Sequence, residues 1–212
     1  GDFNFSMVVP LSSRAKDPFT LAGKVDLHDA DLDNQAWKLH LGSMNGELGF
    51  DAKGFRARGL TALYQGQPVT LDMDIGPGTG HASWPLKVDM RGNFTMAQLV
   101  QGRDELKSLA DIASGSAPFD IGFHIDDAAD NPVHATQVLS VRSNLRGMAL
   151  ALPAPLDKSA QELLPLDLQL GLPFTGGQLR VVLGNLLYAR ARLPSDARPS
   201  AVDIRLGGMA PQ

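Results

Sequence analysis

The feature that most constrains this chain is a one-for-one alternation of apolar and polar residues, which returns from one end of the sequence to the other. Apolar residues hold positions 19, 21, 25 and 27, and the same alternation recurs in the ranges 69–75 and 119–125. A period of two places such residues on one face of a β-sheet. The residues that we assign to this apolar face are Phe19, Leu21, Val25, Leu27, Trp37, Leu39, Leu41, Val69, Leu71, Met73, Ile75, Leu86, Val88, Met90, Phe119, Ile121, Phe123, Ile125, Leu139, Val141, Leu168 and Leu170.

Short polar turns connect the alternating segments. The turn at 51–54 joins the segments 44–50 and 55–64, and the turn at 65–68 leads into 69–75. Connections this short join antiparallel neighbours. We therefore predict a mainly all-β fold, built as a long antiparallel β-meander.

One segment breaks the alternation. Thr95 and Gln98 have the spacing of a helix capping box, and apolar residues follow at helical spacing as far as Ala113. The sequence predicts an amphipathic helix over about 96–112, although Gly102 and Asp104 could divide it into shorter pieces. We therefore divide one elongated domain into a first run of antiparallel sheet at 1–93, a helical insertion at 94–114 and a second run of sheet at 115–212.

A long strand is expected from Val133 onward. Its apolar residues hold odd positions as far as Leu145 and even positions from Met148. A change of parity within a strand requires one extra residue, and Gly147 is the position at which we expect this β-bulge.

Composition excludes several classes of function. The chain has 212 residues, and its formal net charge of -4 provides no basic field for nucleic acid. It contains no Cys, so disulfides and thiolate metal sites are excluded. No apolar run approaches the ~18 residues needed to cross a bilayer. Both ends of the sequence look cut from a longer protein.

No catalytic or metal-binding motif is found. Asp29, Asp31 and Asp33 begin like a calcium loop, but Asn34 and His40 stand where that loop requires Gly and Glu. This segment is therefore expected to be a solvated acidic turn. No nucleophile, base and orienting group lie close together in a motif. We expect no enzyme activity, no cofactor and no metal.

Two stretches of the chain resemble a known family. The first, at 21–73, contains LAGKVDLHDADL, a GxLxF strand and QGQPVTLDM. The second, at 140–162, is SVRSNLRGMALALPAPLDKSAQE, and LPLDLQLGLP follows it. The combination of SxLxG, LPxPL and Lys158 is similar to the YhdP proteins of Gram-negative bacteria. These are large AsmA-like envelope proteins, related in architecture to TamB.

The resemblance implies a fold and a function. Members of the family are anchored in the inner membrane by an N-terminal helix and span the periplasm. They resemble bridge-like lipid transfer proteins, in which a long curved β-sheet forms an open apolar groove for phospholipid acyl chains. This chain would then be an internal periplasmic segment that carries phospholipid between the inner and outer membranes. The helix at 96–112 could plug or cap the groove.

Two alternatives remain open at this point. A closed β-sandwich, serving as a structural or ligand-binding module of the cell envelope without lipid transport, would bury the same face as a core. A polysaccharide-binding β-domain would favour exposed aromatic residues, and the chain has only two Trp and two Tyr. Surface arginines such as Arg142 and Arg146 usually have no specific role, although they could meet anionic head groups.

Overall fold

The computed structural model describes residues 2–8, 20–35, 39–52, 54–76, 86–102, 104–126, 136–172, 177–192 and 201–207. Most of these residues lie in strands, which are β1 (Asp2–Val8), β2 (Thr20–Asn34), β3 (Leu39–Asp51), β4 (Gly54–Tyr64), β5 (Gln67–Ile75), β6 (Leu86–Thr95), β7 (Ala113–Asp126), β8 (Thr136–Ser143), β9 (Met148–Leu150), β10 (Leu166–Leu172), β11 (Gln178–Leu183), β12 (Leu187–Arg192) and β13 (Val202–Leu206). The helical segments are α1 (Met96–Leu99), the 3-10 turn η1 (Asp104–Leu106) and α2 (Ser108–Ile112).

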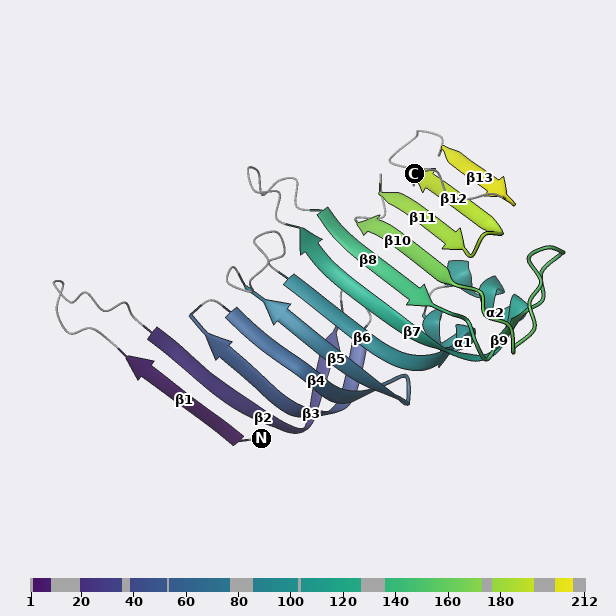
Figure 1. Ribbon diagram of the computed structural model, residues 1–212. Helices are drawn as coiled ribbons and strands as arrows, with labels where there is room; N and C mark the ends of the chain where they lie inside the picture. The colour runs from purple at the N-terminus through teal and green to yellow at the C-terminus, as the bar shows by residue number, and fades with distance from the viewer. Residues whose placement is uncertain are drawn as a thin grey trace. The chain divides into compact units, whose positions relative to one another are not determined.

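The described strands form an antiparallel sheet that follows the order of the chain (Figure 1). Strands β1 to β8 and then β10 to β13 are successive neighbours, and β9 pairs with β7 beside this path. Because β1 and β13 stand at the two ends of the order, the sheet is open. The predicted antiparallel meander is confirmed. The closed β-sandwich is wrong, because the strands from β1 to β8 and from β10 to β13 follow one open path instead of forming a second sheet.

The chain folds into two compact units. The first comprises Gly1–Asp89 with His124–Ala135, and the second comprises Met90–Phe123 with Thr136–Gln212. No described helix is long and apolar enough to cross a membrane.

Bulges set the register of the first unit. The acidic residues expected in a turn lie inside β2, so that expectation is wrong. Asp29 takes a left-handed backbone with φ 52°, and its N–H donates to Asn45 Oδ1 at 3.0 Å. Asp31 Oδ1 accepts a hydrogen bond from the backbone N–H of Ser43 at 3.1 Å, and Ser43 has φ 49°. These hydrogen bonds join β2 and β3 at the point where their register shifts. The periodicity of the sequence did not reveal this shift.

A third bulge lies in β4 at Gly59. Its φ is 64°, and its N–H donates to Asp72 Oδ1 at 2.8 Å. The bulge advances β4 by one residue, so Ala57 stands opposite Met73 and Leu60 stands opposite Leu71. The apolar positions of β4 therefore stay on one side of the sheet although their parity in the sequence changes.

The predicted helix at 96–112 is shorter and divided. The capping box is confirmed, because Thr95 Oγ1 accepts from the Gln98 backbone N–H at 3.3 Å and Gln98 Oε1 accepts from the Thr95 backbone N–H at 2.9 Å. The chain leaves α1 at Val100, and Gly102 follows with φ 76°. A left-handed residue cannot continue a right-handed helix, so η1 and α2 begin as separate turns.

The interruption near Gly147 is larger than a one-residue bulge. Strand β8 ends at Ser143, the residues 144–147 leave the sheet, and β9 resumes pairing on β7. Gly147 has φ 98°, and a Cβ added there would lie 2.3 Å from the carbonyl oxygen of Ser116. A Cβ on Gly115 would lie 2.2 Å from the carbonyl oxygen of Gly147. Only glycine permits this backbone crossing, which explains why the chain breaks here.

The second unit has a close-packed core beside this crossing. Phe94, Ala117 and Met148 are fully buried, and Phe119 is 2% exposed. The rings of Phe94 and Phe119 lie 6.4 Å apart at 48°, so β6 and β7 present these residues to the same side.

Candidate functional site

The candidate site is an apolar face, which is built in each unit from strand register. In the first unit Val25, Leu48, Ala57 and Met73 stand opposite one another across four strands. Directly opposed residues of a sheet share a face. The apolar face of this unit comprises Leu21, Val25, Leu27, Ala30, Leu41, Met44, Leu48, Phe50, Phe55, Ala57, Leu60, Ala62, Val69, Leu71, Met73 and Ile75.

The second unit repeats this construction. Val141, Leu168, Val181, Ala189 and Ile204 form one cross-strand row from β8 to β13. The apolar face of these strands comprises Leu139, Val141, Leu166, Leu168, Leu170, Leu172, Leu179, Val181, Leu183, Leu187, Ala189, Ala191, Val202, Ile204 and Leu206. Along β7, Ile121 and Phe123 continue the alternation of Phe119, and Ile125 extends it into the part of the strand that belongs to the first unit.

Burial is graded along the face of the first unit. Leu60, Val69 and Leu71 are between 0% and 3% exposed, so this end is packed as a core. Toward the other end Val25 and Met73 are half-buried, and Phe55 is 49% exposed. The face is therefore covered at one end of its strands and accessible at the other.

The second unit shows the same gradation across its strands. The residues of the apolar face in β8 and β10 are half-buried, and Leu183 is buried. On β13, Val202 is 60%, Ile204 is 61% and Leu206 is 60% exposed. A continuous row of apolar side chains with this exposure is unusual on a soluble monomer, so we take it as a candidate binding surface.

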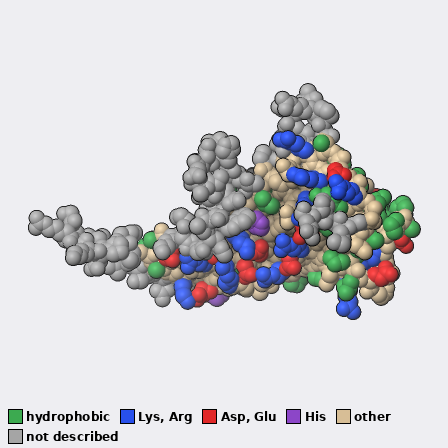
Figure 2. Space-filling view, turned by 45° about the horizontal axis from the view of Figure 1, so that its top comes forward, with side chains coloured by type: hydrophobic (Ala, Val, Ile, Leu, Met, Phe, Trp, Pro, Cys, Tyr) green, Lys and Arg blue, Asp and Glu red, His purple; other side chains and the backbone are tan. Residues whose placement is uncertain are grey.

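The opposite face of the sheet carries most of the charged side chains, beside a few apolar ones such as Val182 and Tyr188. Lys24 Nζ lies 2.8 Å from Glu47 Oε1, and this hydrogen-bonded ion pair raises the pKa of the lysine. Arg142 Nε lies 3.1 Å from Asp167 Oδ2 across β8 and β10. Figure 2 shows basic and acidic side chains interspersed on the visible surface. The two faces thus differ in chemistry, as the alternation predicts.

The structure locates most of the predicted face residues. Phe19 and Trp37 lie outside the described residues. Five of the others are buried, and the rest are half-buried. The buried ones are Leu41, Val69, Leu71, Met90 and Phe119. The half-buried ones are Leu21, Val25, Leu27, Leu39, Met73, Ile75, Leu86, Val88, Ile121, Phe123, Ile125, Leu139, Val141, Leu168 and Leu170.

Sequence reasoning missed part of the face. Phe50 and Phe55 are cross-strand partners on it, with ring centroids 6.2 Å apart. The three exposed residues of β13 also belong to it. Apolar and polar residues alternate in the sequences of these strands. Only the register between strands shows that the apolar residues belong to the same face.

The LPAPLDK segment folds as a closed loop. Leu150 and Lys158 exchange backbone hydrogen bonds of 2.9 and 3.1 Å, which join the two ends of the loop. The Lys158 side chain is buried, and its Nζ donates to the carbonyl oxygens of Met148 at 2.6 Å and Ser159 at 2.8 Å. Burial lowers the pKa of Lys158, which the nearby Glu162 carboxylate partly offsets. These contacts give the lysine a structural role beneath the loop.

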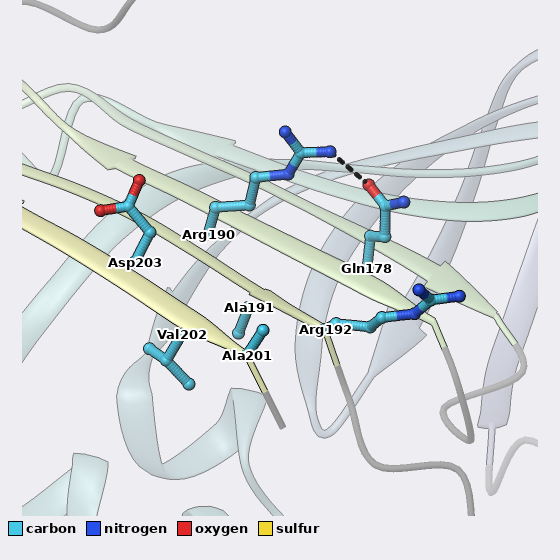
Figure 3. A pocket seen from close by; sticks show the side chains of 7 residues that line it. All are labelled: Gln178, Arg190, Ala191, Arg192, Ala201, Val202 and Asp203. Carbon is cyan, nitrogen blue, oxygen red and sulfur yellow. Dashed lines mark hydrogen bonds between the residues drawn. The ribbon is translucent and has the colours of Figure 1, made fainter. Parts of the chain in front are cut away.

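A small pocket of about 300 Å³ lies where β11, β12 and β13 meet (Figure 3). Apolar and polar residues line it together. The lining residues are Gln178, Arg190, Ala191, Arg192, Ala201, Val202 and Asp203. The described part of the chain has no cluster of His, Asp or Glu side chains that could hold a metal ion.

Comparison with known proteins gives one family. A family model described as "YhdP protein" matches residues 1–212. Neither the curated proteins nor the solved structures contain a match.

Proposed function

Since this chain belongs to the YhdP family, we propose that it is a periplasmic segment of a bridge-like lipid transfer protein. In this proposal the apolar face carries phospholipid acyl chains between the inner and outer membranes of a Gram-negative bacterium. The complete protein is anchored in the inner membrane, and this segment acts as a conduit without enzyme activity or cofactor. The family and the open sheet support this assignment.

The observation that carries the proposal is the accessibility of the apolar face. A sheet that served only as a structural core would bury this face along its whole length. Here the row from Val141 to Ile204 stays half-buried or exposed. Each lipid methylene that such a surface removes from water contributes about 0.8 kcal/mol. An acyl chain can thus be held without polar recognition and can slide from row to row.

Two adjacent residues of β10 provide a matched test. Leu168 lies on the apolar face, and Gln169 lies on the polar face opposite Arg180. A photoreactive amino acid is placed at either position, the chain is purified from cells, and cross-linked lipid is identified by mass spectrometry. We expect phospholipid adducts at position 168 and a background level at position 169. Equal labelling at both positions, or a chain that carries no lipid, would contradict the proposal.

A further inference from the structure

Three β-bulges in neighbouring strands of the first unit lie side by side, and together we call them the bulge row. The bulged residues are Asp29 in β2, Ser43 in β3 and Gly59 in β4, and each has a positive φ. Along β3, every register shift against β2 and β4 falls between Leu41 and Leu48. The bulges therefore interrupt adjacent strands at about the same level of the sheet.

Polar side chains hold all three bulges. The hydrogen bonds are Asp29 N–H to Asn45 Oδ1 at 3.0 Å, Ser43 N–H to Asp31 Oδ1 at 3.1 Å and Gly59 N–H to Asp72 Oδ1 at 2.8 Å. The bulge takes each N–H out of the regular ladder, so it needs such an acceptor. Asp31, Asn45 and Asp72 alternate with the apolar residues of their strands and so lie on the opposite face of the sheet. Side chains of one face thus fix the register of the other.

The exposure of the apolar face changes at the bulge row. The residues before the row are 21–27, 48–57 and 73–75, and the residues beyond it are 30–34, 39–44, 60–64 and 67–71. On β5, Met73 before the row is half-buried, whereas Leu71 beyond it is buried. On β4, Phe55 before the row is exposed, whereas Leu60 beyond it is fully buried. On these strands the face is accessible before the row and forms a core beyond it.

The same change occurs on β3 but not on β2. Leu48 before the row is half-buried, and Met44 beyond it is buried. On β2, Leu32 remains exposed although it lies beyond the row. Ala57, which adjoins the row on β4, is already buried. The boundary between accessible face and core therefore runs across β3, β4 and β5.

The bulges give this boundary a physical cause. A bulge bends its strand and increases the local twist. Figure 1 shows β2 and β3 curving toward the ends that lie beyond the bulge row. A Cβ added to Gly46 would lie 2.8 Å from Leu60 Cδ2, so the Leu60 side chain already fills the space above this glycine. The apolar side chains beyond the row thus pack on their own sheet.

We propose that the bulge row is the lateral boundary of the lipid path in the first unit. Acyl chains lie on the apolar face before the row and stop at it on β3, β4 and β5. A close-packed core has no room for a chain of methylenes, whereas half-buried side chains can be covered by one. Asp31, Asn45 and Asp72 are the positioning residues of this boundary. The inference rests on the proposed lipid-carrying function, and it states which part of the apolar face the lipid uses.

The test maps where a lipid tail touches the unmodified chain. Phosphatidylglycerol with a photoreactive diazirine in one acyl chain is bound to the delipidated chain, and peptide mass spectrometry locates the adducts after illumination. The urea-unfolded chain corrects for differences in reactivity between side chains. We expect about tenfold more adduct at Met73 than at Leu71, and the same preference for Phe55 over Leu60, because a close-packed interior excludes the probe.

The other adduct patterns separate the boundary from the lipid-carrying function. Equal adducts on both sides of the row would overturn the boundary, although the proposed conduit would stand. Adducts confined to the second unit would have the same meaning. A chain without adducts at any position would contradict the lipid-carrying function itself, and the boundary would fall with it.

Asp72→Ala tests the positioning role. It removes the acceptor of the Gly59 N–H, so the bulge is released and Leu60 should leave the core. The ratio of adducts at Met73 to those at Leu71 should fall by roughly tenfold, because a hydrogen bond to a charged acceptor shifts a local equilibrium by about this factor. Asp72→Asn keeps an accepting oxygen at the same position and should restore the ratio of the parent chain.

Asp26→Ala is the matched control. It removes a carboxylate from an exposed position of β2 on the same face as Asp72, and it leaves the three bulge hydrogen bonds unchanged. If this variant lowers the adduct ratio as much as Asp72→Ala does, the effect is one of charge and the positioning role is wrong. If Asp72→Ala lowers the Tm but keeps the parent ratio, Asp72 only stabilises the fold.

A second variant covers the case in which Asp72→Ala does not fold. Asp31→Ala releases the Ser43 N–H in the same way. Its effect is measured from the adducts at Leu48 and Met44, which lie on the two sides of the row in β3. A parent-like ratio in the folded Asp31→Ala chain would overturn the positioning role of the bulge contacts.

Discussion

Among single residues, Lys158 shows how a buried charge is accommodated. Its ammonium group is held by two carbonyl oxygens, and burial lowers its pKa from the ordinary value of 10.5. Between the lowered folded-state pKa and 10.5 the unfolded chain binds more protons than the folded chain. The free energy of unfolding therefore rises with pH through this window.

The variant Lys158→Met should remove that rise. It should also cost about 1–3 kcal/mol of stability at neutral pH, because two buried carbonyl oxygens lose their donor. Urea unfolding at pH values on both sides of the window measures both effects. The exposed Lys107→Met variant should keep the parent pH dependence. If the free energy of unfolding of Lys158→Met still rises with pH as in the parent chain, the rise does not come from Lys158.

A substitution at Gly147 tests the backbone crossing, where the segment 144–147 comes close to β7. Gly147→Ala places a Cβ 2.3 Å from a backbone oxygen in a left-handed conformation, so one strand must shift. We expect a loss of roughly 2–4 kcal/mol in thermal or urea unfolding. Gly66→Ala has φ 74° but meets no atom within 4 Å, and it should cost only about 1 kcal/mol. Similar costs for the two variants would show that the crossing is not tight.

At the scale of elements, β7 presents opposite chemistry on its two sides. Ile121 and Phe123 follow the buried Phe119 on the apolar side, and Asp120 pairs with Arg91 on the other, with Nε and Oδ1 3.3 Å apart. A strand of this kind allows one side to be altered while the other is kept. The role of the apolar side can therefore be tested without rebuilding the sheet.

Ile121→Asp or Phe123→Asp should block lipid on this strand. A carboxylate on the apolar side disfavours an acyl chain, because its desolvation costs several kcal/mol. We expect at least a tenfold loss of co-purified phospholipid, measured by mass spectrometry against protein concentration. His124→Asp places the same charge on the other side and should retain lipid. Thermal unfolding of each variant shows whether it folds, and equal lipid loss in folded variants would count against the apolar path.

For the whole molecule, the open sheet leaves part of its apolar face exposed. If lipid binds this face, the thermal stability of the folded chain should depend on the lipid. A ligand that binds only the folded state at a hundred times its Kd adds about 2.7 kcal/mol. For a chain of this size that corresponds to a rise in Tm of roughly 5–10 °C. We expect delipidated protein to have a lower Tm, which phospholipid restores. If the Tm is the same with and without phospholipid, the apolar face does not bind the lipid.

Several features follow from local sequence. The antiparallel meander and the Thr95–Gln98 capping box can be predicted, because strand periodicity and capping depend on residues close in the chain. The change of parity placed an interruption near Gly147, but it predicted one extra residue, whereas residues 144–147 leave the sheet. The continuation of β2 through Asp29 and Asp31 could not, since these residues favour turns unless a partner strand satisfies them. Their partners, Asn45 and Ser43, come from β3.

The sequence by itself determined that the chain has one apolar side per strand and antiparallel neighbours. Only the tertiary structure decided how these sides combine, because bulges at Asp29, Ser43 and Gly59 shift register between strands. It also decided which apolar residues are buried as core, such as Leu60, and which stay accessible, such as Ile204. Alternation specifies the direction of a side chain, whereas exposure depends on what the rest of the fold places over it.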